Sequence, residues 1–182
     1  KVGPSPEWLV RRLEAVGQRS INNVVDVTNY ITFELGNPCH VFDLAKLEGS
    51  TLRIRWAQEG EKLTTLDDKT RVLKKTDLVV ADAQRAQSLA GVIGGADSEV
   101  GDTTKDVVFE MATWDPATIR RPARRLDIRT DASHRFERIV DPRTITEAAA
   151  RAVALLMTVA GGAVAGGVLE DGHPLTDPSA AA

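Results

Sequence analysis

The sequence is poor in cysteine and in aromatic residues, and it has no excess of positive charge. One cysteine in 182 residues excludes an internal disulfide framework and a cysteine-rich zinc site. The formal net charge of −3 is unlike that of a free-standing nucleic-acid-binding protein, which usually carries a strongly basic balance. Three Trp, four Phe and one Tyr leave most of the core to Val, Leu, Ile and Ala.

Long uninterrupted apolar runs are also missing. The apolar stretch near residues 148–168 is broken by Arg151 and by Gly161-Gly162, so it does not predict a transmembrane span. No secretory signal peptide is recognisable at the N-terminus. The chain begins at Lys1 rather than Met, as expected of a piece cut from a longer protein.

The length and the hydrophobic patterning predict one α+β domain over residues 1–172 and a tail at residues 173–182. Residues 37–43 are expected to form a loop. Apolar residues at helical spacing predict helices at residues 5–16, 23–35, 115–122 and 144–160. Alternating patterns predict strands at residues 51–57, 62–66, 71–73, 78–81, 88–93 and 106–114, with a short further strand near 164–169.

Some side chains are expected at defined places in these elements. Ser5 is expected to cap the first helix, and Pro122 to kink or end the third after about two turns. The inward residues of the first helix are predicted to be Leu9, Leu13 and Val16. Those of the strand at 51–57 are predicted to be Leu52, Ile54 and Trp56. Those of the last helix are predicted to be Ile145, Ala149, Ala152, Leu156 and Val159.

The residue types of two adjacent pairs, Cys39-His40 and Ser133-His134, are those of a nucleophile-base dyad. Adjacent side chains have the wrong geometry for one. Neighbouring residues point to opposite sides of a strand and diverge on a helix, so their side chains rarely meet. The histidines, with His173 as the third, lack the close spacing of a helical metal site. No metal site is therefore predicted.

Glu110 lies inside an otherwise apolar segment, residues 107–112. Burying a carboxylate is costly unless the group is paired. One interpretation places Glu110 on a solvent-facing side, because Phe109 and Met111 alternate with it. The other makes it a pocket carboxylate that accepts a hydrogen bond from a ligand. The pattern leaves both interpretations open.

The glycine-rich segment at residues 91–95 follows a predicted strand. Its spacing is not that of a dinucleotide-binding loop, and no helical pattern follows it. A tight turn is one interpretation. The other is the close approach of a ligand to bare backbone, which glycine permits without a steric cost.

Arginines are concentrated in residues 118–138, where seven of them face three acidic residues. This window carries +4, so the remainder of the chain carries −7. The window is interpreted either as a solvated, salt-bridged face or as a local phosphate-binding surface. Within it, Thr130-Asp131 resembles a helix N-cap, whose backbone N–H groups suit an oxyanion or phosphate.

Four ordered motifs resemble those of one family: QRSINNVVDVTNYITFELGNPCHVFD at 18–43, GVIGG at 91–95, VVFEMATWDPATIRR at 107–121 and RTDASHRFERIVDP at 129–142. Together with GPSPEWL at 3–9 they resemble the B3/B4 module of the bacterial phenylalanyl-tRNA synthetase β subunit. The resemblance covers about residues 1–172. It implies a mixed, sandwich-like β-sheet core flanked by helices.

The resemblance also implies an editing site that hydrolyses mischarged tyrosyl-tRNA(Phe) with a positioned water. It implies catalytic roles for His40 and Thr130. Substrate binding falls to Glu110, Gly94 and Ala132, with Glu110 as the acceptor of the phenolic hydroxyl. Arg19 is placed near the tRNA 3′ end.

The implied partners are the tRNA(Phe) 3′ end, the tyrosine moiety, the synthetase α subunit and the remaining β modules, in the cytoplasm and without a membrane. No cofactor is expected for this domain, since ATP and Mg²⁺ would belong to the intact synthetase.

Three residues depart from the family pattern. Ile139 and Asp127 stand where glycine is common, and Pro122 lies inside the arginine-rich helix. None of them is an implied site residue.

The alternative functions are a non-catalytic tRNA-binding or scaffold module and a free-standing trans-editing deacylase.

Overall fold

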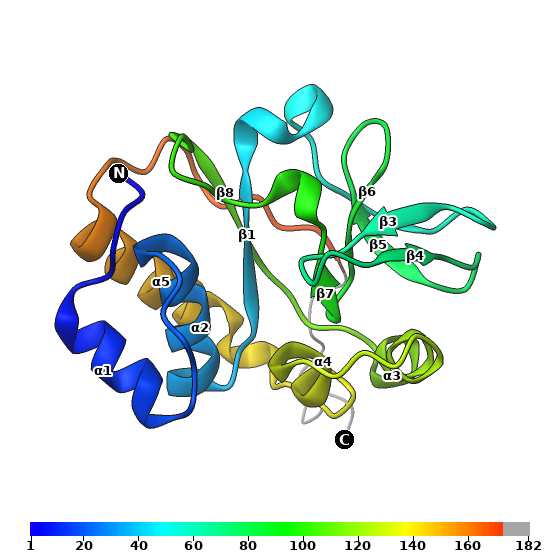
Figure 1. The fold of residues 1–182 in the computed structure, drawn as a ribbon, viewed down its shortest axis with the longest axis horizontal. Coiled ribbons are helices and arrows are strands. Elements are labelled where there is room, and N and C mark those ends of the chain that lie inside the picture. Colours follow the sequence, from blue (N-terminus) through cyan, green and yellow to red (C-terminus); the bar gives the residue numbers. More distant parts are fainter. Residues whose placement is uncertain (173–182) are drawn as a thin grey trace, which may run out of the picture.

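The computed structural model describes residues 1–172, so the predicted tail at 173–182 lies outside the described residues. Its elements form three layers (Figure 1). A two-stranded ribbon lies in the middle, with helices on one side and a sheet and hairpin on the other. The expected α+β class, with sheets flanked by helices, is confirmed, and every recorded strand pairing is antiparallel.

The helical layer consists of α1 (Glu7–Ala15), α2 (Asn23–Leu35) and α5 (Ile145–Ala160). The central ribbon pairs β1 (Cys39–Asp43) with β8 (Val107–Met111). The sheet has the order β2-β5-β6-β7, formed by Arg53–Trp56, Leu78–Ala81, Ala86–Leu89 and Ile93–Gly94. The hairpin pairs β3 (Lys62–Thr64) with β4 (Thr70–Val72). Two further helices, α3 (Pro116–Arg125) and α4 (Asp131–Phe136), follow β8.

Helix α2 has the bounds that the sequence predicts because both of its ends carry clear signals. The Asn22 side chain accepts hydrogen bonds from the backbone N–H groups of Val24 and Val25, at 3.1 and 2.9 Å. Gly36 follows in the left-handed region at φ 74° and ends the helix.

The segment at 37–43 is a strand from Cys39 onward, so the predicted loop is wrong there. Both faces of this strand are covered by other layers, so it lacks the apolar-polar alternation of a half-exposed strand. The register pairs His40 with Glu110.

Several inward-facing predictions need correction. Ser5 does not cap α1: its hydroxyl donates to the buried Asp26 carboxylate at 2.6 Å. Val16 is 49% exposed. In α5 the buried residues are Ala148, Ala152 and Leu155, so the prediction is confirmed for Ala152 and is one position off at Ala149 and Leu156.

The strand predictions hold except at three places. The strand predicted at 88–93 is instead β6 and β7, which a turn joins into an antiparallel pair. In β2, an edge strand of the sheet, Ile54 and Trp56 are exposed, while Arg55 pairs with Glu61 at 2.7 Å. Residues 164–169, predicted as a strand, form no strand and are exposed.

Pro122 does not end α3, which continues to Arg125. Its ring lies on the buried side with Ile119 and Ala123, and its carbonyl accepts the Leu126 N–H at 2.9 Å. Burial of this face offsets the missing N–H. Asp127, which replaces the family's glycine, adopts φ 52°, a region that aspartate tolerates better than most residues.

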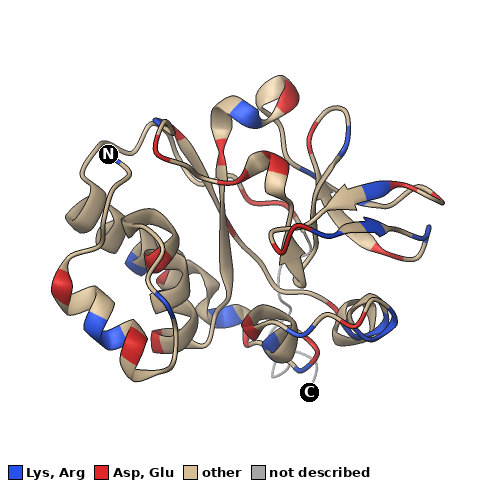
Figure 2. Ribbon diagram, viewed as in Figure 1, with Lys and Arg blue, Asp and Glu red and all other residues tan. Residues whose placement is uncertain are grey.

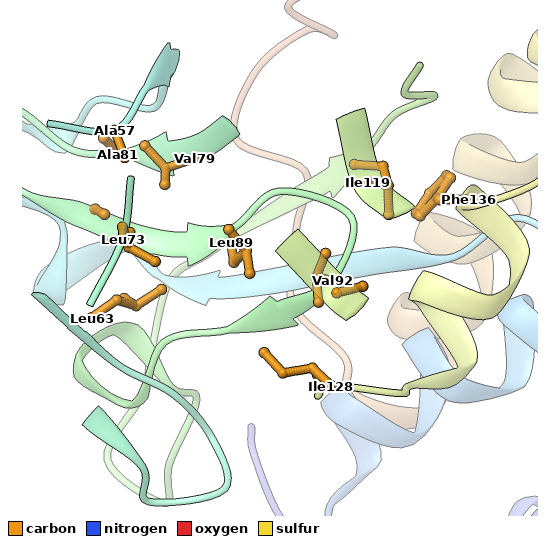
Figure 3. Packing of buried hydrophobic residues seen from close by; sticks show 12 residues of the cluster. Ala57, Leu63, Leu73, Val79, Ala81, Leu89, Val92, Ile119, Ile128 and Phe136 are labelled. Carbon is orange, nitrogen blue, oxygen red and sulfur yellow. The ribbon is translucent and has the colours of Figure 1, made fainter. Parts of the chain in front are cut away.

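The largest buried cluster lies between the sheet, the hairpin and the α3–α4 pair (Figure 3). It includes Leu63, Leu73, Val79, Leu89, Val92, Ile119, Ile128 and Phe136. The cluster fixes α3 and α4 against the glycine segment, which places the arginine-rich window beside residues 91–95.

Candidate functional site

His40 and Glu110 lie directly opposite each other on β1 and β8. Directly paired residues of an antiparallel ribbon project from the same face, so the imidazole and the carboxylate are neighbours. The same face carries Phe42, whose ring meets the His40 ring edge-on at 4.5 Å between centroids. This face of the ribbon packs toward the sheet, where Phe42 joins Val80 and Ala90 in one buried cluster.

The opposite face of the ribbon packs against the helical layer. Cys39, Phe109 and Met111 contact the cluster formed by α2 and α5. The alternation of Phe109 and Met111 with Glu110 was therefore a correct observation, but it does not place Glu110 in solvent. Glu110 lies on the face that packs toward the sheet, as Val108 does, and it is half-buried there.

Burial changes the protonation of both site residues. It raises the pKa of Glu110 from its ordinary 4.5 to about 7, because a charged carboxylate is poorly solvated there. It lowers the pKa of His40 from 6.5 to about 4 for the same reason, so the imidazole is neutral at neutral pH. Burial also raises the pKa of the Cys39 thiol, which keeps it protonated and unsuited to nucleophilic attack.

Glu110→Gln is expected to stabilise the chain progressively as pH rises from about 4.5 to about 7. In this range the folded wild type retains a proton that the unfolded chain has lost, so its stability falls with pH. The free energy of unfolding of the variant minus that of the wild type should grow by on the order of 3 kcal/mol.

Urea denaturation at a series of pH values measures this difference. The difference is preferable to the wild-type curve alone, because the lowered pKa of His40 makes stability rise between about pH 4 and 6.5. A difference that stays constant over the whole range would contradict a buried, raised-pKa Glu110.

Gly94 lies against the His40 ring. A Cβ on Gly94 would be 2.6 Å from His40 Cε1 and 2.9 Å from both His40 Nε2 and Leu66 Cδ1. The group that approaches the bare backbone is thus the imidazole of the protein itself. The Gly94 carbonyl accepts the Leu66 N–H at 3.0 Å, so this oxygen is already engaged.

His40 Nε2 is buried without a hydrogen-bond partner in the described part of the chain. Buried polar side-chain atoms are usually satisfied, and an exception at a packed position points to a bound water or ligand. An unpaired ring nitrogen on the residue that pairs with Glu110 gives this site the capacity to orient a polar molecule.

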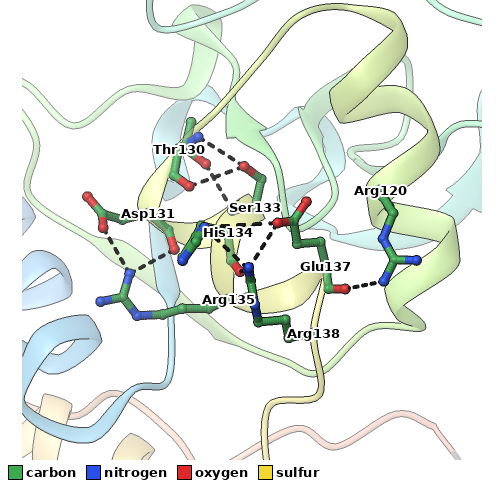
Figure 4. Close-up of polar contacts among 8 residues, drawn as sticks. All are labelled: Arg120, Thr130, Asp131, Ser133, His134, Arg135, Glu137 and Arg138. Atoms are coloured by element: carbon green, nitrogen blue, oxygen red, sulfur yellow. Dashed lines mark hydrogen bonds and ion pairs between the residues drawn. The ribbon is translucent and has the colours of Figure 1, made fainter.

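Thr130 joins the glycine segment to α4. Its hydroxyl donates to the Val92 carbonyl at 2.7 Å and accepts the Ser133 N–H at 3.0 Å. The Ser133 hydroxyl in turn accepts the Thr130 N–H at 2.9 Å, which completes a capping box (Figure 4). The N-cap predicted at this position is confirmed, and the hydroxyl is already engaged with two backbone groups.

The remaining implied residues lie around this junction. Ala132, in the first turn of α4, is partly buried and packs against the main cluster. Arg19 is exposed on the loop between α1 and α2. The neighbouring Gln18 donates from Nε2 to the Asp131 carboxylate at 3.0 Å, which ties this loop to α4.

Sequence reasoning missed the side chains that hold His40 in place. Phe42 and Leu66 both contact the imidazole or its neighbour Gly94. Phe42 was detectable, because a residue two positions from His40 shares its face once residues 39–43 are assigned to a strand. Leu66 was not, since only the tertiary fold brings the β3–β4 turn to Gly94.

Ion pairs neutralise part of the arginine-rich window (Figure 4). Arg135 pairs with Asp131 and Arg138 with Glu137, each at 2.9 Å. Arg125 pairs with Asp77. Arg120 donates to the Glu137 backbone carbonyl at 2.6 Å, which leaves its charge uncompensated. The window is therefore partly a salt-bridged face, as one interpretation held.

No three His, Cys, Asp or Glu side chains gather closely enough within residues 1–172 to hold a metal ion. None of the helices in this part combines the length and apolarity needed to cross a membrane.

Comparison with known proteins gives one consistent picture. A family model described as the B3/4 domain matches residues 1–161. The phenylalanine–tRNA ligase beta subunit of Geobacter sulfurreducens is 53% identical over 169 residues, covering 93% of this chain and 21% of that protein.

Two further beta subunits of the same name are each 51% identical to the chain. That of Syntrophotalea carbinolica aligns over 171 residues, 94% of this chain and 21% of the relative. That of Halalkalibacterium halodurans aligns over 173 residues, 95% and 21%. The chain therefore spans about one fifth of the length of the curated relatives that it matches.

Proposed function

The chain belongs to the B3/4 domain family, and from this membership we propose that it is the editing domain of a phenylalanine–tRNA ligase beta subunit. In this role it hydrolyses tyrosyl-tRNA(Phe), the product of a charging error. The α subunit, the remaining β modules and the tRNA(Phe) 3′ end are the proposed partners. The observation that carries the proposal is the half-buried pair of His40 and Glu110, with the His40 ring against Gly94.

Glu110 supplies the selectivity in this proposal. Tyrosine and phenylalanine differ by one phenolic hydroxyl, and a hydrophobic synthetic pocket rejects an added hydroxyl by only about 100-fold. A second site that hydrogen-bonds the hydroxyl rejects phenylalanine by roughly 10⁴–10⁵, because its own polar group would be left unpaired. The ionised Glu110 accepts the phenolic O–H in a charge-assisted bond, and its pKa of about 7 leaves this form well populated at neutral pH.

His40 positions the attacking water. Its pKa of about 4 makes the imidazole a weak base, so hydrogen bonding through the unpaired Nε2 is its main contribution. The water oxygen attacks the ester carbonyl carbon, and the bond to the ribose oxygen breaks. The products are free tyrosine and tRNA with its 3′-hydroxyl restored. An aminoacyl ester is already activated, so water is the one co-reactant assigned and no cofactor is needed for this step.

The other implied residues hold the site in shape or admit the substrate. Thr130 acts as a positioning residue, because its hydroxyl fixes the glycine segment through Val92. Ala132 leaves room for the aromatic ring, and Gly94 leaves room for the imidazole. Arg19, on the loop tied to α4 by Gln18, contacts the tRNA 3′ end.

His40→Ala is expected to lower the rate constant of deacylation by about 100-fold, since misplacing a group that positions a reactant by roughly 1 Å already costs on this order. The assay is single-turnover hydrolysis of tyrosyl-tRNA(Phe) by the beta subunit assembled with its α subunit. His40→Gln, which offers an amide near the place of Nε2 but no basic nitrogen, should restore at least about a third of the rate. Equal losses in the two variants would assign His40 a role as a base instead.

A further inference from the structure

We propose that the outward face of α3, continued by Arg129, binds the RNA phosphate backbone and directs the acceptor end of tRNA toward the editing site. This inference rests on the proposed function and extends it with a surface for the nucleic-acid part of the substrate. The surface is defined by Arg121, Arg124 and Arg129.

The orientation of α3 concentrates positive charge on one side. Ile119, Pro122 and Ala123 are buried against the core. The arginines of α3 are exposed, and Figure 2 shows Lys and Arg colouring along much of this helix. A chain with a net charge of −3 therefore presents one compact basic surface.

Three arginines of this surface keep their charges available. Within residues 1–172, the guanidinium groups of Arg121, Arg124 and Arg129 form no ion pair or hydrogen bond, whereas Arg125, Arg135 and Arg138 are each paired with a carboxylate. All three unpaired residues are exposed. Unpaired guanidinium groups on a short path suit a polyanion with regularly spaced charges, since each binds a phosphate in a fork-like geometry.

The basic surface leads to the site along the chain. Arg129 lines an open hollow together with Thr130, Asp131 and His134. Thr130 in turn bonds to Val92 of the glycine segment, next to Gly94 and His40. The end of an RNA strand that lies on α3 therefore reaches the hollow. The glycine segment lies behind the hollow.

Charge complementarity favours RNA as the occupant. The remainder of the chain is acidic, so a polyanion is repelled from other surfaces and steered to this one. The competing occupant is an acidic face of another protein module, and the experiment below separates the two.

The test uses the beta subunit assembled with its α subunit and an uncharged acceptor-stem hairpin ending in CCA. Fluorescence anisotropy gives the Kd of the hairpin from about 50 mM to about 200 mM salt. The test variant is R121Q/R124Q. Arg129 is left unchanged because it adjoins Thr130. The control R11Q/K105Q removes the same charge from exposed positions on α1 and before β8.

Two lost phosphate contacts should reduce the slope of log K against log salt by about 1.5 and raise Kd roughly tenfold at the lower salt. The KM of deacylation should rise with kcat unchanged, and the control should leave the slope unchanged. An unchanged slope in R121Q/R124Q, or an equal change in the control, would overturn the inference. Loss of α–β assembly in gel filtration would overturn it in favour of a protein partner.

Failure of the proposed function is separable from failure of this inference. Hydrolysis of tyrosyl-tRNA(Phe) by the wild type, with no effect of α3 on the slope, overturns the surface alone. The editing function alone is overturned if R121Q/R124Q reduces the slope of log K against log salt but the wild type hydrolyses no tyrosyl-tRNA(Phe).

Discussion

Replacing Glu110 with alanine is expected to lower the preference for tyrosyl-tRNA over phenylalanyl-tRNA in deacylation by about 100-fold or more. The half-buried carboxylate is the acceptor that the phenolic hydroxyl requires, and desolvation holds its pKa near 7, so its hydrogen bond is made in a poorly solvated place. Without it, the site distinguishes the two amino acids by shape alone. The measurement is the ratio of kcat/KM values for the two aminoacyl-tRNAs in the assembled enzyme.

Two further variants sharpen this prediction. Glu110→Gln keeps an acceptor oxygen but no charge, so its selectivity should lie between those of the wild type and the alanine variant. Glu147→Ala removes an exposed carboxylate from α5 and should change nothing. An unaltered ratio in Glu110→Ala, with the fold intact by circular dichroism, would remove the phenol-acceptor role.

Gly94→Ala is expected to lower deacylation by at least about 100-fold, because displacing a positioning group by roughly 1 Å has effects of this size. The new Cβ would be 2.6 Å from His40 Cε1, a distance that real Cβ atoms do not tolerate. Leu66 can yield, since it is 40% exposed, but the imidazole is packed against Phe42. The overpacking should also cost about 1–3 kcal/mol of unfolding free energy.

A double-mutant cycle isolates the contact. In a His40→Ala background, Gly94→Ala should lose most of its stability cost, because the clashing ring is gone. Gly101→Ala is the matched control, since its Cβ would meet no atom within 4 Å. Equal stability costs of Gly94→Ala in both backgrounds would show that the clash does not involve His40.

The sequence predicted elements whose signals are local. Helix α2 was predicted at its observed bounds because its apolar residues recur at helical spacing and Gly36 marks its end in the chain itself. The N-cap at Thr130 was predicted for the same reason. These features depend on hydrogen bonds between residues a few positions apart. The local sequence specifies such bonds.

The sequence could not predict what depends on a third layer. Residues 39–43 were expected to be a loop because a strand covered on both faces shows no alternation. The orientation of Glu110 stayed open for the same reason. Only the packing of α2 and α5 on one face of the ribbon and of the sheet on the other settles it. The contact between Gly94 and His40 joins residues 54 positions apart, so no local sequence pattern predicts it.

The central claim is that the chain removes tyrosine from tRNA(Phe) at the site formed by His40, Glu110 and Gly94. The most direct measurement is single-turnover deacylation of tyrosyl-tRNA(Phe) and phenylalanyl-tRNA(Phe) by the wild-type assembled enzyme, with no ATP present to recharge the tRNA. The predicted result is rapid loss of tyrosine while phenylalanine is released at the rate of spontaneous hydrolysis. Equal rates for the two substrates, or tyrosine release no faster than in buffer, would contradict the account.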